Sequence, residues 1–167
     1  MKYNVLTLIL ITLGSSSGVR ASSTTRFTPY FESISQQLDL PPKLLESICI
    51  VESDLRTHVI NINDGGIGNS SFGICQISFN TAKFLGIRLN AECSGKVSGL
   101  SKCILLEPRF NIYLAGFYLR KQLNRYRGNL SKAVSAYNAG SSISGNLKYV
   151  RKVLYTQKAL IGWSKSI

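Results

Sequence analysis

Apolar positions recur at helical spacing over most of this chain. After a polar stretch at residues 22–26, apolar side chains at positions 27, 30, 31, 34 and 38 predict a first helix that ends before Pro41. Pro41 and Pro42 then open a second helix, because proline is tolerated in a first helical turn. The apolar stripe of this second helix comprises Leu44, Leu45, Ile48, Cys49 and Val51.

Glu52 closes that stripe, one turn beyond Ile48 and Cys49, so its carboxyl group is expected to point toward the buried side. Burial makes ionisation of a carboxyl group costly, and the proton is then held more tightly than in water. A general acid needs that property. Glu52 is therefore a candidate catalytic residue, although a glutamate in this position taken alone also fits an ion-paired helix end.

A change of composition interrupts the helical pattern at residues 61–71. This segment is rich in Asn, Gly and Ser, which favour turns, and it predicts a long loop or small irregular hairpin that borders a cleft. Residues 72–77 are expected to be extended, and Ser78 to cap a helix that holds Ala82, Phe84 and Leu85. Residues 86–106 are predicted to be loop.

The second half of the chain is predicted to hold three more helices. The longest covers residues 107–126 and is stopped by Gly128 and Asn129; the next covers residues 130–137. The last carries Leu147, Val150, Val153 and Leu154 on its apolar side. A length of 167 residues fits one domain. We predict a mainly helical α+β domain with a small irregular β patch between the second and third helices.

The N-terminus has the pattern of an export signal. Lys2 precedes an apolar run at residues 5–13, and small residues end at Ala21, so residues 1–21 are expected to be a signal peptide and residues 22–167 the mature domain. The apolar run is shorter than a typical transmembrane helix. The alternative to a cleaved signal peptide is an uncleaved membrane anchor. We expect an exported protein of the periplasm or cell envelope, without stable membrane insertion after cleavage.

Export would place the four cysteines where disulfides persist, and four cysteines allow three pairings. The residues between Cys93 and Cys103 are rich in Gly, Ser and Lys and resemble a loop that one bridge would close. Cys49 and Cys75 would then pair and tie the helix of Glu52 to the extended segment. A metal site is disfavoured, because there is no C-x2-C pair and His58 is the only histidine.

Composition adds a strong positive charge. Twenty Lys and Arg residues stand against eight Asp and Glu residues, for a formal net charge of +12. Such a surface favours a polyanionic partner, which for an exported protein is the bacterial wall or a membrane surface. The basic residues are scattered and form no compact motif of a DNA-reading fold, so nucleic acid is not an expected partner.

Three segments carry a resemblance to a known family. They are Glu52-Ser53, residues 71–78 with the sequence SFGICQIS, and residues 136–140 with the sequence AYNAG. In this order and at these distances they resemble the signature blocks of the lysozyme-like lytic transglycosylases, which cut peptidoglycan. The resemblance covers most of the chain after residue 27 and implies a lysozyme-like fold with a glycan cleft. Cys75 replaces the usual methionine, and Phe72 replaces a small or polar residue.

The resemblance implies a role for each matched residue. Glu52 is expected to be the catalytic acid and base, and Ser53 is the small residue that commonly follows it. Gln76 is expected to line the cleft and hydrogen-bond sugar groups, and the Tyr137 hydroxyl to reach toward the catalytic carboxyl. Ser53, Gln76, Tyr137 and Asn138 are thus expected to be substrate-binding residues.

Most glycosidases use two carboxylates, and here Asp64 is the candidate for the second. Asp54 lies two residues from Glu52 and is therefore turned to another side of the helix. The resemblance implies that no second carboxylate is needed, because the substrate's own 2-acetamido and 6-hydroxyl groups serve instead. The expected reaction breaks the β-1,4 bond between MurNAc and GlcNAc without a cofactor and leaves 1,6-anhydroMurNAc ends.

Three other functions remain open. A muramidase would use Asp64 to position water, and an idle wall-binding or assembly factor would hold glycan without cleaving it. A cationic membrane-active protein rests on charge alone and ranks last. Small exported relatives often serve a secretion, conjugation or pilus apparatus, so envelope-spanning machinery is an expected partner besides the peptidoglycan strands.

Overall fold

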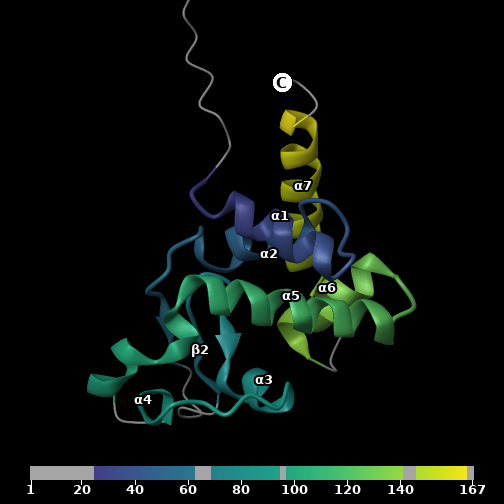
Figure 1. Cartoon of the computed structure of the whole chain (residues 1–167). Coiled ribbons are helices and arrows are strands. Elements are labelled where there is room, and N and C mark those ends of the chain that lie inside the picture. The colour runs from purple at the N-terminus through teal and green to yellow at the C-terminus, as the bar shows by residue number, and fades with distance from the viewer. Residues whose placement is uncertain (1–24, 63–68, 95–96, 141–145, 165–167) are drawn as a thin grey trace, which may run out of the picture.

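Helices form most of the described chain, and one short sheet interrupts them (Figure 1). The structure is a computed structural model that describes residues 25–62, 69–94, 97–140 and 146–164. The first half contains α1 (Thr28–Gln37), α2 (Leu44–Ser53), β1 (Ile60–Asn61), β2 (Ser71–Phe72), β3 (Ile77–Ser78) and α3 (Phe79–Phe84). The second half contains α4 (Ala91–Ser94), the 3₁₀ segments η2 (Val97–Lys102) and η3 (Ile104–Leu106), then α5 (Pro108–Arg125), α6 (Leu130–Ala139) and α7 (Leu147–Ser164).

The predicted helices are confirmed, with shifts at their ends. The second helix begins at Leu44, two residues after the prolines, because Lys43 adopts a left-handed conformation with φ 59°. Ser78 caps α3 as predicted, since its hydroxyl accepts from the Thr81 N–H. The helix predicted to be the longest, α5, has 18 residues, and the last helix, α7, has the same length.

The prediction of loop for residues 86–106 is wrong in part, because α4, η2 and η3 lie there. These elements are too short to show a helical period in the sequence. Local contacts hold them instead: the Asn90 amide donates to Glu92 Oε2 and to the Lys102 carbonyl, and its oxygen accepts from the Ile104 N–H.

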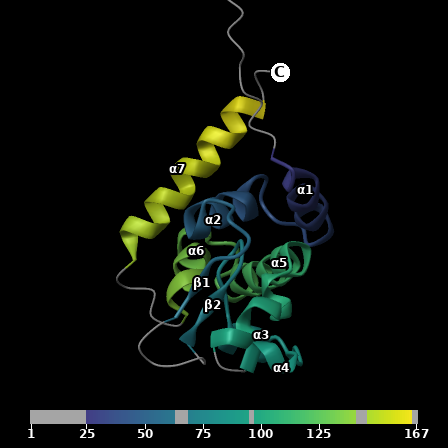
Figure 2. The same cartoon turned by 90° about the vertical axis from the view of Figure 1, so that its left-hand side faces the viewer.

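Helix α2 is the buried centre of the fold. Leu44, Leu45 and Ile48 have no exposed surface, and α1, α5 and α7 pack around them. Gly116 of α5 permits the close approach of α1, because a Cβ atom there would lie 2.6 Å from Ile34 Cγ2. Both views place α1, α2 and the C-terminal half of α7 at one end of the molecule, and the sheet, α3 and α4 at the other (Figures 1 and 2).

The sheet is antiparallel in the order β1-β2-β3, with Phe72 opposite both Ile60 and Ile77. The small β patch of the prediction is thus confirmed. Gly73 follows β2 with φ +73°, and a Cβ atom there would lie 2.7 Å from the Leu105 carbonyl oxygen, so this turn requires glycine. The buried Asn111 side chain donates to the carbonyls of Phe72 and Leu105 and accepts from the Cys75 N–H.

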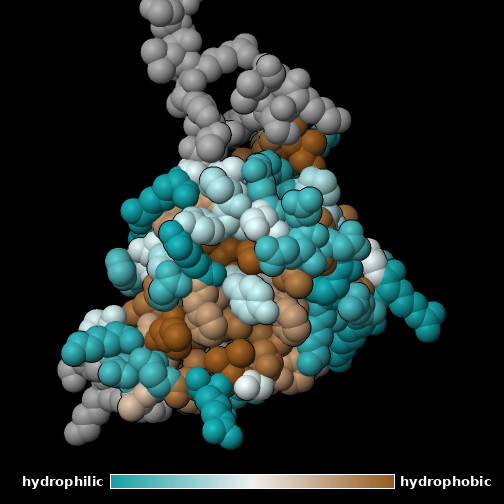
Figure 3. All heavy atoms as spheres, viewed as in Figure 1, coloured by the Kyte–Doolittle hydropathy of each residue, from teal (hydrophilic) through white to brown (hydrophobic). Residues whose placement is uncertain are grey.

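Both predicted disulfides are confirmed. Cys49 pairs with Cys75 and joins α2 to the turn between β2 and β3, and Cys93 pairs with Cys103. None of the helices in the described residues is long and apolar enough to cross a membrane. Apolar side chains nevertheless gather on the face that α3 and α5 share (Figure 3). Phe84, Tyr113 and Phe117 are exposed large apolar residues of these two helices.

Candidate active site

Glu52 borders a cleft between the sheet and the helices α5 and α6. The cleft has a volume of about 370 Å³. Its lining is mainly polar and consists of Glu52, Asn61, Asn69, Ser71, Gln76, Ile77, Ser78, Thr81, Tyr118, Tyr137, Asn138 and Gly140. Of the described residues, Glu52 is the one carboxylate in this lining. We call this hollow the Glu52 cleft.

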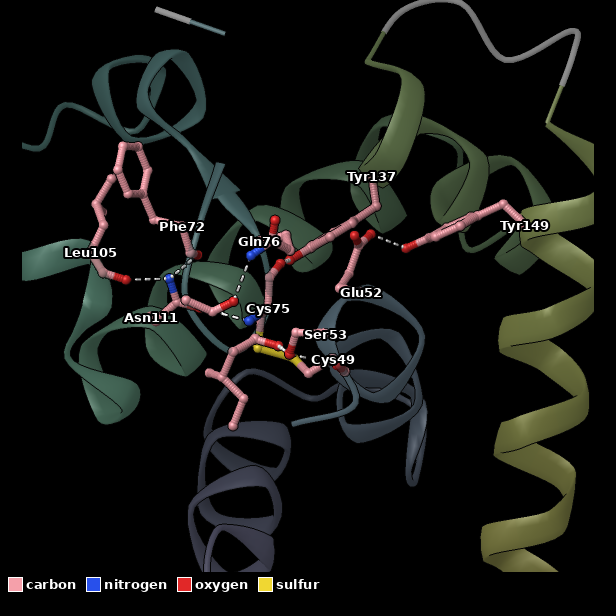
Figure 4. Close-up of a disulfide and its surroundings, with 12 residues drawn as sticks. Cys49, Glu52, Ser53, Phe72, Cys75, Gln76, Leu105, Asn111, Tyr137 and Tyr149 are labelled. Carbon is pink, nitrogen blue, oxygen red and sulfur yellow. Dashed lines mark hydrogen bonds between the residues drawn. A yellow bond between two sulfur atoms is a disulfide. The ribbon is translucent and has the colours of Figure 1, made fainter. Parts of the chain in front are cut away.

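The Glu52 carboxyl group is held by the start of α7. The Tyr149 hydroxyl donates to Glu52 Oε1 at 2.5 Å (Figure 4). Burial raises the pKa of the Glu52 carboxyl above its ordinary value. Hydrogen bonds from Tyr149 and Asn138 and the positive charge of Lys152 oppose this effect without cancelling it. Glu52 therefore keeps its proton to a higher pH than a solvated glutamate does.

Tyr137 lies beside Glu52, but its hydroxyl has another partner. The prediction that this hydroxyl reaches the carboxyl group is wrong: it donates to the Cys75 carbonyl at 2.9 Å. The Cys75 carbonyl belongs to the tight turn after β2, so the tyrosine satisfies an acceptor there. The ring packs against Tyr118 with 5.4 Å between centroids. Burial, followed by the negative charge of Glu52, raises the pKa of Tyr137, which therefore stays a neutral phenol.

The sequence analysis did not identify Tyr149, whose hydroxyl makes the contact with the Glu52 carboxyl group that was expected of Tyr137. Burial, the charge of Glu52 and their hydrogen bond raise the pKa of Tyr149, so it remains a donor. The sequence carried one signal, since Tyr149 lies one turn before Val153 on the apolar side of α7. That position fits ordinary packing equally well. An Asn146 side chain that donates to Asn138 also ties the start of α7 to α6.

Ser53 is not placed to bind substrate, which corrects the expectation from the resemblance. Its side chain is buried, and its hydroxyl donates to the Ile74 carbonyl at 2.6 Å. The residue lies behind the Glu52 cleft, where it fixes the end of α2 to the turn after β2 (Figure 4). A small residue after Glu52 is required there because the two segments are in contact.

Gln76 lines the Glu52 cleft, but its amide group is already engaged. The amide nitrogen donates to the carbonyls of Val59 and Gly73, and the amide oxygen accepts from the Ser71 hydroxyl. Gln76 has φ +50°, so these three bonds stabilise a backbone conformation that non-glycine residues rarely adopt. Its main contribution is to shape the cleft wall.

The remaining predicted residues have different positions. Asn138 is exposed at the end of α6 and lines the Glu52 cleft. Asp64 lies outside the described residues. Asp54 is exposed and follows α2 in a left-handed conformation, with φ 56°. No three His, Cys, Asp or Glu side chains within the described ranges come together to hold a metal ion.

Comparison with solved structures agrees with the fold. The structure resembles an inactive mutant of the lytic transglycosylase Slt from Pseudomonas aeruginosa, with 20% identity and a TM-score of 0.52. It also resembles the 70 kDa soluble lytic transglycosylase Slt70 from Escherichia coli, with 23% identity and a TM-score of 0.50. Each match covers 79% of this chain but only 22% and 19% of those proteins, so the chain spans about a fifth of their length.

A family model also matches most of the chain. Residues 29–158 match the family described as Transglycosylase SLT domain, and this range includes α2, the sheet and all residues that line the Glu52 cleft. The lysozyme-like fold predicted from the three sequence blocks is confirmed. The chain belongs to the Transglycosylase SLT domain family.

Proposed function

We propose that this protein is a peptidoglycan lytic transglycosylase that breaks the β-1,4 bond between MurNAc and GlcNAc. One observation carries the proposal. Glu52 borders a polar cleft, the pKa of its carboxyl group is raised, and no other described carboxylate lines that cleft. Such a group suits proton donation to a sugar leaving group.

Glu52 acts first as an acid and then as a base. Because Oε1 accepts from Tyr149, we assign the reactive proton to Oε2. This proton passes to the glycosidic oxygen as its bond to the anomeric carbon breaks. The resulting Glu52 carboxylate then takes the proton of the MurNAc 6-hydroxyl while that oxygen bonds to the anomeric carbon. The product is a 1,6-anhydro ring, and no water is consumed.

The other cleft residues position the sugar. Asn138 and Asn61 are exposed residues of the cleft lining, and Ser78 and Thr81 add hydroxyl groups to it. Tyr137 and Gln76 belong to the same lining. The Cys49–Cys75 disulfide fixes the relative position of α2 and the cleft wall at Gln76, so Glu52 is held at a constant depth. Preorganisation of this kind supports catalysis.

The finer parts of the proposal concern location and partners. Residues 1–21 are proposed to direct export to the periplasm or cell envelope, where the two disulfides are stable. The family resemblance further supports local opening of the wall for a secretion, conjugation or pilus apparatus. A muramidase remains the alternative, since Asp64 would then supply the second carboxylate.

Digestion of purified peptidoglycan tests the proposal. The new ends should be one water lighter than hydrolytic products and resist reduction by borohydride, which mass spectrometry detects. Reducing ends would support the muramidase instead. If purified protein binds the wall but releases no fragments, the binding-factor function is favoured.

A further inference from the structure

Acidic residues are concentrated in one segment of this basic protein. Five of the eight acidic residues of the chain lie between residues 28 and 54, which contain a single basic residue, Lys43. Residues 28–54 thus carry a negative charge in a protein whose net charge is +12. Helices α1 and α2 and the loop between them make up this segment (Figure 2). Three of its five acidic residues, Glu32, Asp39 and Glu46, line one groove, whereas Glu52 and Asp54 lie at the far end of α2.

Part of this segment lines a groove of about 690 Å³. Its lining comes from α1, the loop to α2, the first turn of α2 and the end of α7, and consists of Phe31, Glu32, Ser35, Gln36, Asp39, Leu40, Pro42, Lys43, Glu46 and Ile161. We call it the α1–α2 groove. It shares no lining residue with the Glu52 cleft.

The floor of the groove is apolar and its rim is acidic. Phe31 and Leu40 are buried members of the hydrophobic core, and Pro42 and Ile161 continue the apolar surface. On the rim, the Glu32 side chain is 62% exposed and the Asp39 side chain fully exposed. A groove with an apolar floor and charged edges is typical of sites that accept one face of an amphipathic helix.

The charge of the groove remains negative after its internal ion pairs are counted. Lys43 is shared, because Nζ lies 2.9 Å from Glu32 and 3.3 Å from Glu46. One lysine therefore faces two carboxylates. Asp39 pairs with Arg120 of α5 at 3.2 Å, but both groups are reached by solvent, and exposed pairs of this kind are weak. A cationic ligand can thus compete for both rim carboxylates.

We propose that the α1–α2 groove docks a cationic amphipathic helix of a partner protein, with apolar residues on one face and Lys or Arg beside them. Charge complementarity selects this occupant, because a cationic segment is repelled by most of this protein and attracted at this groove. An anionic lipid or an acidic segment would instead prefer the basic remainder of the surface.

The position of the groove leaves the catalytic cleft open. Glu46 lines the groove from the first turn of α2, and Glu52 lines the cleft from its last turn, about 9 Å further along the helix axis. A partner bound in the α1–α2 groove would thus leave the Glu52 cleft free to accept glycan. Docking is independent of the proposed reaction and can be tested without it.

Binding of two designed peptides to the full-length protein tests the proposal. One is a helix-forming peptide with a leucine face and flanking lysines, and the other has glutamates in place of the lysines. Calorimetry should show binding of the lysine peptide that weakens with salt, and hydrogen exchange should show protection in α1 and the first turn of α2. The double variant Glu32→Gln/Asp39→Asn should weaken binding about tenfold.

Asp54→Asn provides the matched control. Asp39 and Asp54 are both exposed, and both adopt a left-handed conformation just after a helix, with φ 48° and 56°. Asparagine accepts this conformation, so each substitution removes one charge without backbone strain. Asp54→Asn should leave binding of the lysine peptide within twofold of the wild type.

Three results would overturn the proposal. The first is a lysine peptide that does not bind, or that binds the double variant as well as the wild type. The second is protection that falls on α5 or on the Glu52 cleft. The third is a concentration-dependent dimer, seen by light scattering, that the double variant abolishes; the occupant would then be a second copy of this chain.

Discussion

Two glutamates of the same helix illustrate how surroundings determine the role of a buried acid. Glu46 and Glu52 are six residues apart on α2, and both are withdrawn from solvent. Glu46 is 2% exposed, accepts from the Thr28 hydroxyl at 3.1 Å and pairs with Lys43. Glu52 has a phenol and an amide as its nearest partners, and no ion pair within 4 Å involves it among the described residues.

The comparison shows that burial alone does not make a carboxyl group suitable for acid catalysis. Glu46 lies in the first turn of α2, where Lys43 forms an ion pair with it at 3.3 Å. Glu52 lies in the last turn, where the dipole opposes a negative charge. The two ends of one helix thus give the two glutamates different partners, an ion pair for Glu46 and neutral hydrogen-bond donors for Glu52.

The largest expected effect is the loss of cleavage in Glu52→Gln. The amide has nearly the same shape but has no proton to donate, so cleavage of peptidoglycan should fall at least a hundredfold, roughly the contribution of one general acid. Fragment release from purified wall material measures the effect. Substantial residual cleavage would assign the acid to another residue.

Thermal unfolding of the same variant checks the raised pKa. In the wild type, the folded state binds the Glu52 proton more tightly than the unfolded state, so stability declines as pH rises from the ordinary glutamate range through the raised pKa. Glu52→Gln removes this loss. Its melting temperature at pH 7 should therefore equal or exceed that of the wild type, whereas at low pH the two should converge.

Removing the Cys49–Cys75 bridge should affect both the stability and the activity at the cleft end of α2. The double variant Cys49→Ala/Cys75→Ala should lose about 3 kcal/mol of unfolding free energy by the chain-entropy estimate, and its cleavage rate should fall because the wall beside Glu52 loosens. Denaturant titration and fragment release measure the two effects.

The matched control is Cys93→Ala/Cys103→Ala, which opens a bridge away from the Glu52 cleft. It should lose a similar free energy and retain its cleavage rate at a temperature where it is folded. Equal loss of activity in both double variants would show that the first bridge has no special role in the cleft.

A smaller effect is expected when Glu46 is changed to Gln. The variant should lose about 2 kcal/mol of unfolding free energy, because the pairing with Lys43 weakens in a buried setting. Cleavage should stay within twofold, since the side chain lies far from the cleft. The variant thus separates the two glutamates: Glu46→Gln should change stability, and Glu52→Gln should change activity.

The smallest effect is a shift of the pH profile in Tyr149→Phe. The Tyr149 hydrogen bond lowers the pKa of Glu52, so its removal should raise that pKa further. The alkaline limb of the cleavage profile should move to higher pH, and the rate should fall by about tenfold from loss of one bond to the carboxyl group. A lower rate with an unmoved limb would limit Tyr149 to packing.

Much of this fold could be predicted because it follows from local pattern. The stripe from Leu44 to Val51 predicted α2, and the composition of residues 61–71 predicted the interruption beside the sheet. The cysteine spacing was informative because a short loop between Cys93 and Cys103 left one other pairing. Each of these signals lies within a few residues of the feature it predicts.

Other features could not be predicted because they depend on contacts between distant segments. Tyr149 meets Glu52 across 97 residues, and the sequence cannot show which of two tyrosines supplies that hydroxyl. The roles of Ser53 and Gln76 depend on carbonyl groups of the turn after β2 and of Val59, which become acceptors only in the folded chain. The sequence blocks contain Glu52, Gln76, Tyr137 and Asn138, which line one cleft, but they do not show which atoms these residues contact.

The buried side chain of Asn111 has a mechanical consequence. One planar amide joins β2, the turn at Cys75 and η3 to helix α5 through bonds of 2.7 to 2.9 Å. Sliding the sheet along α5 would break all three bonds together, and water has no access to replace them. The joint between the sheet and α5 therefore resists shear, because movement along it has no partial step that keeps some of these bonds.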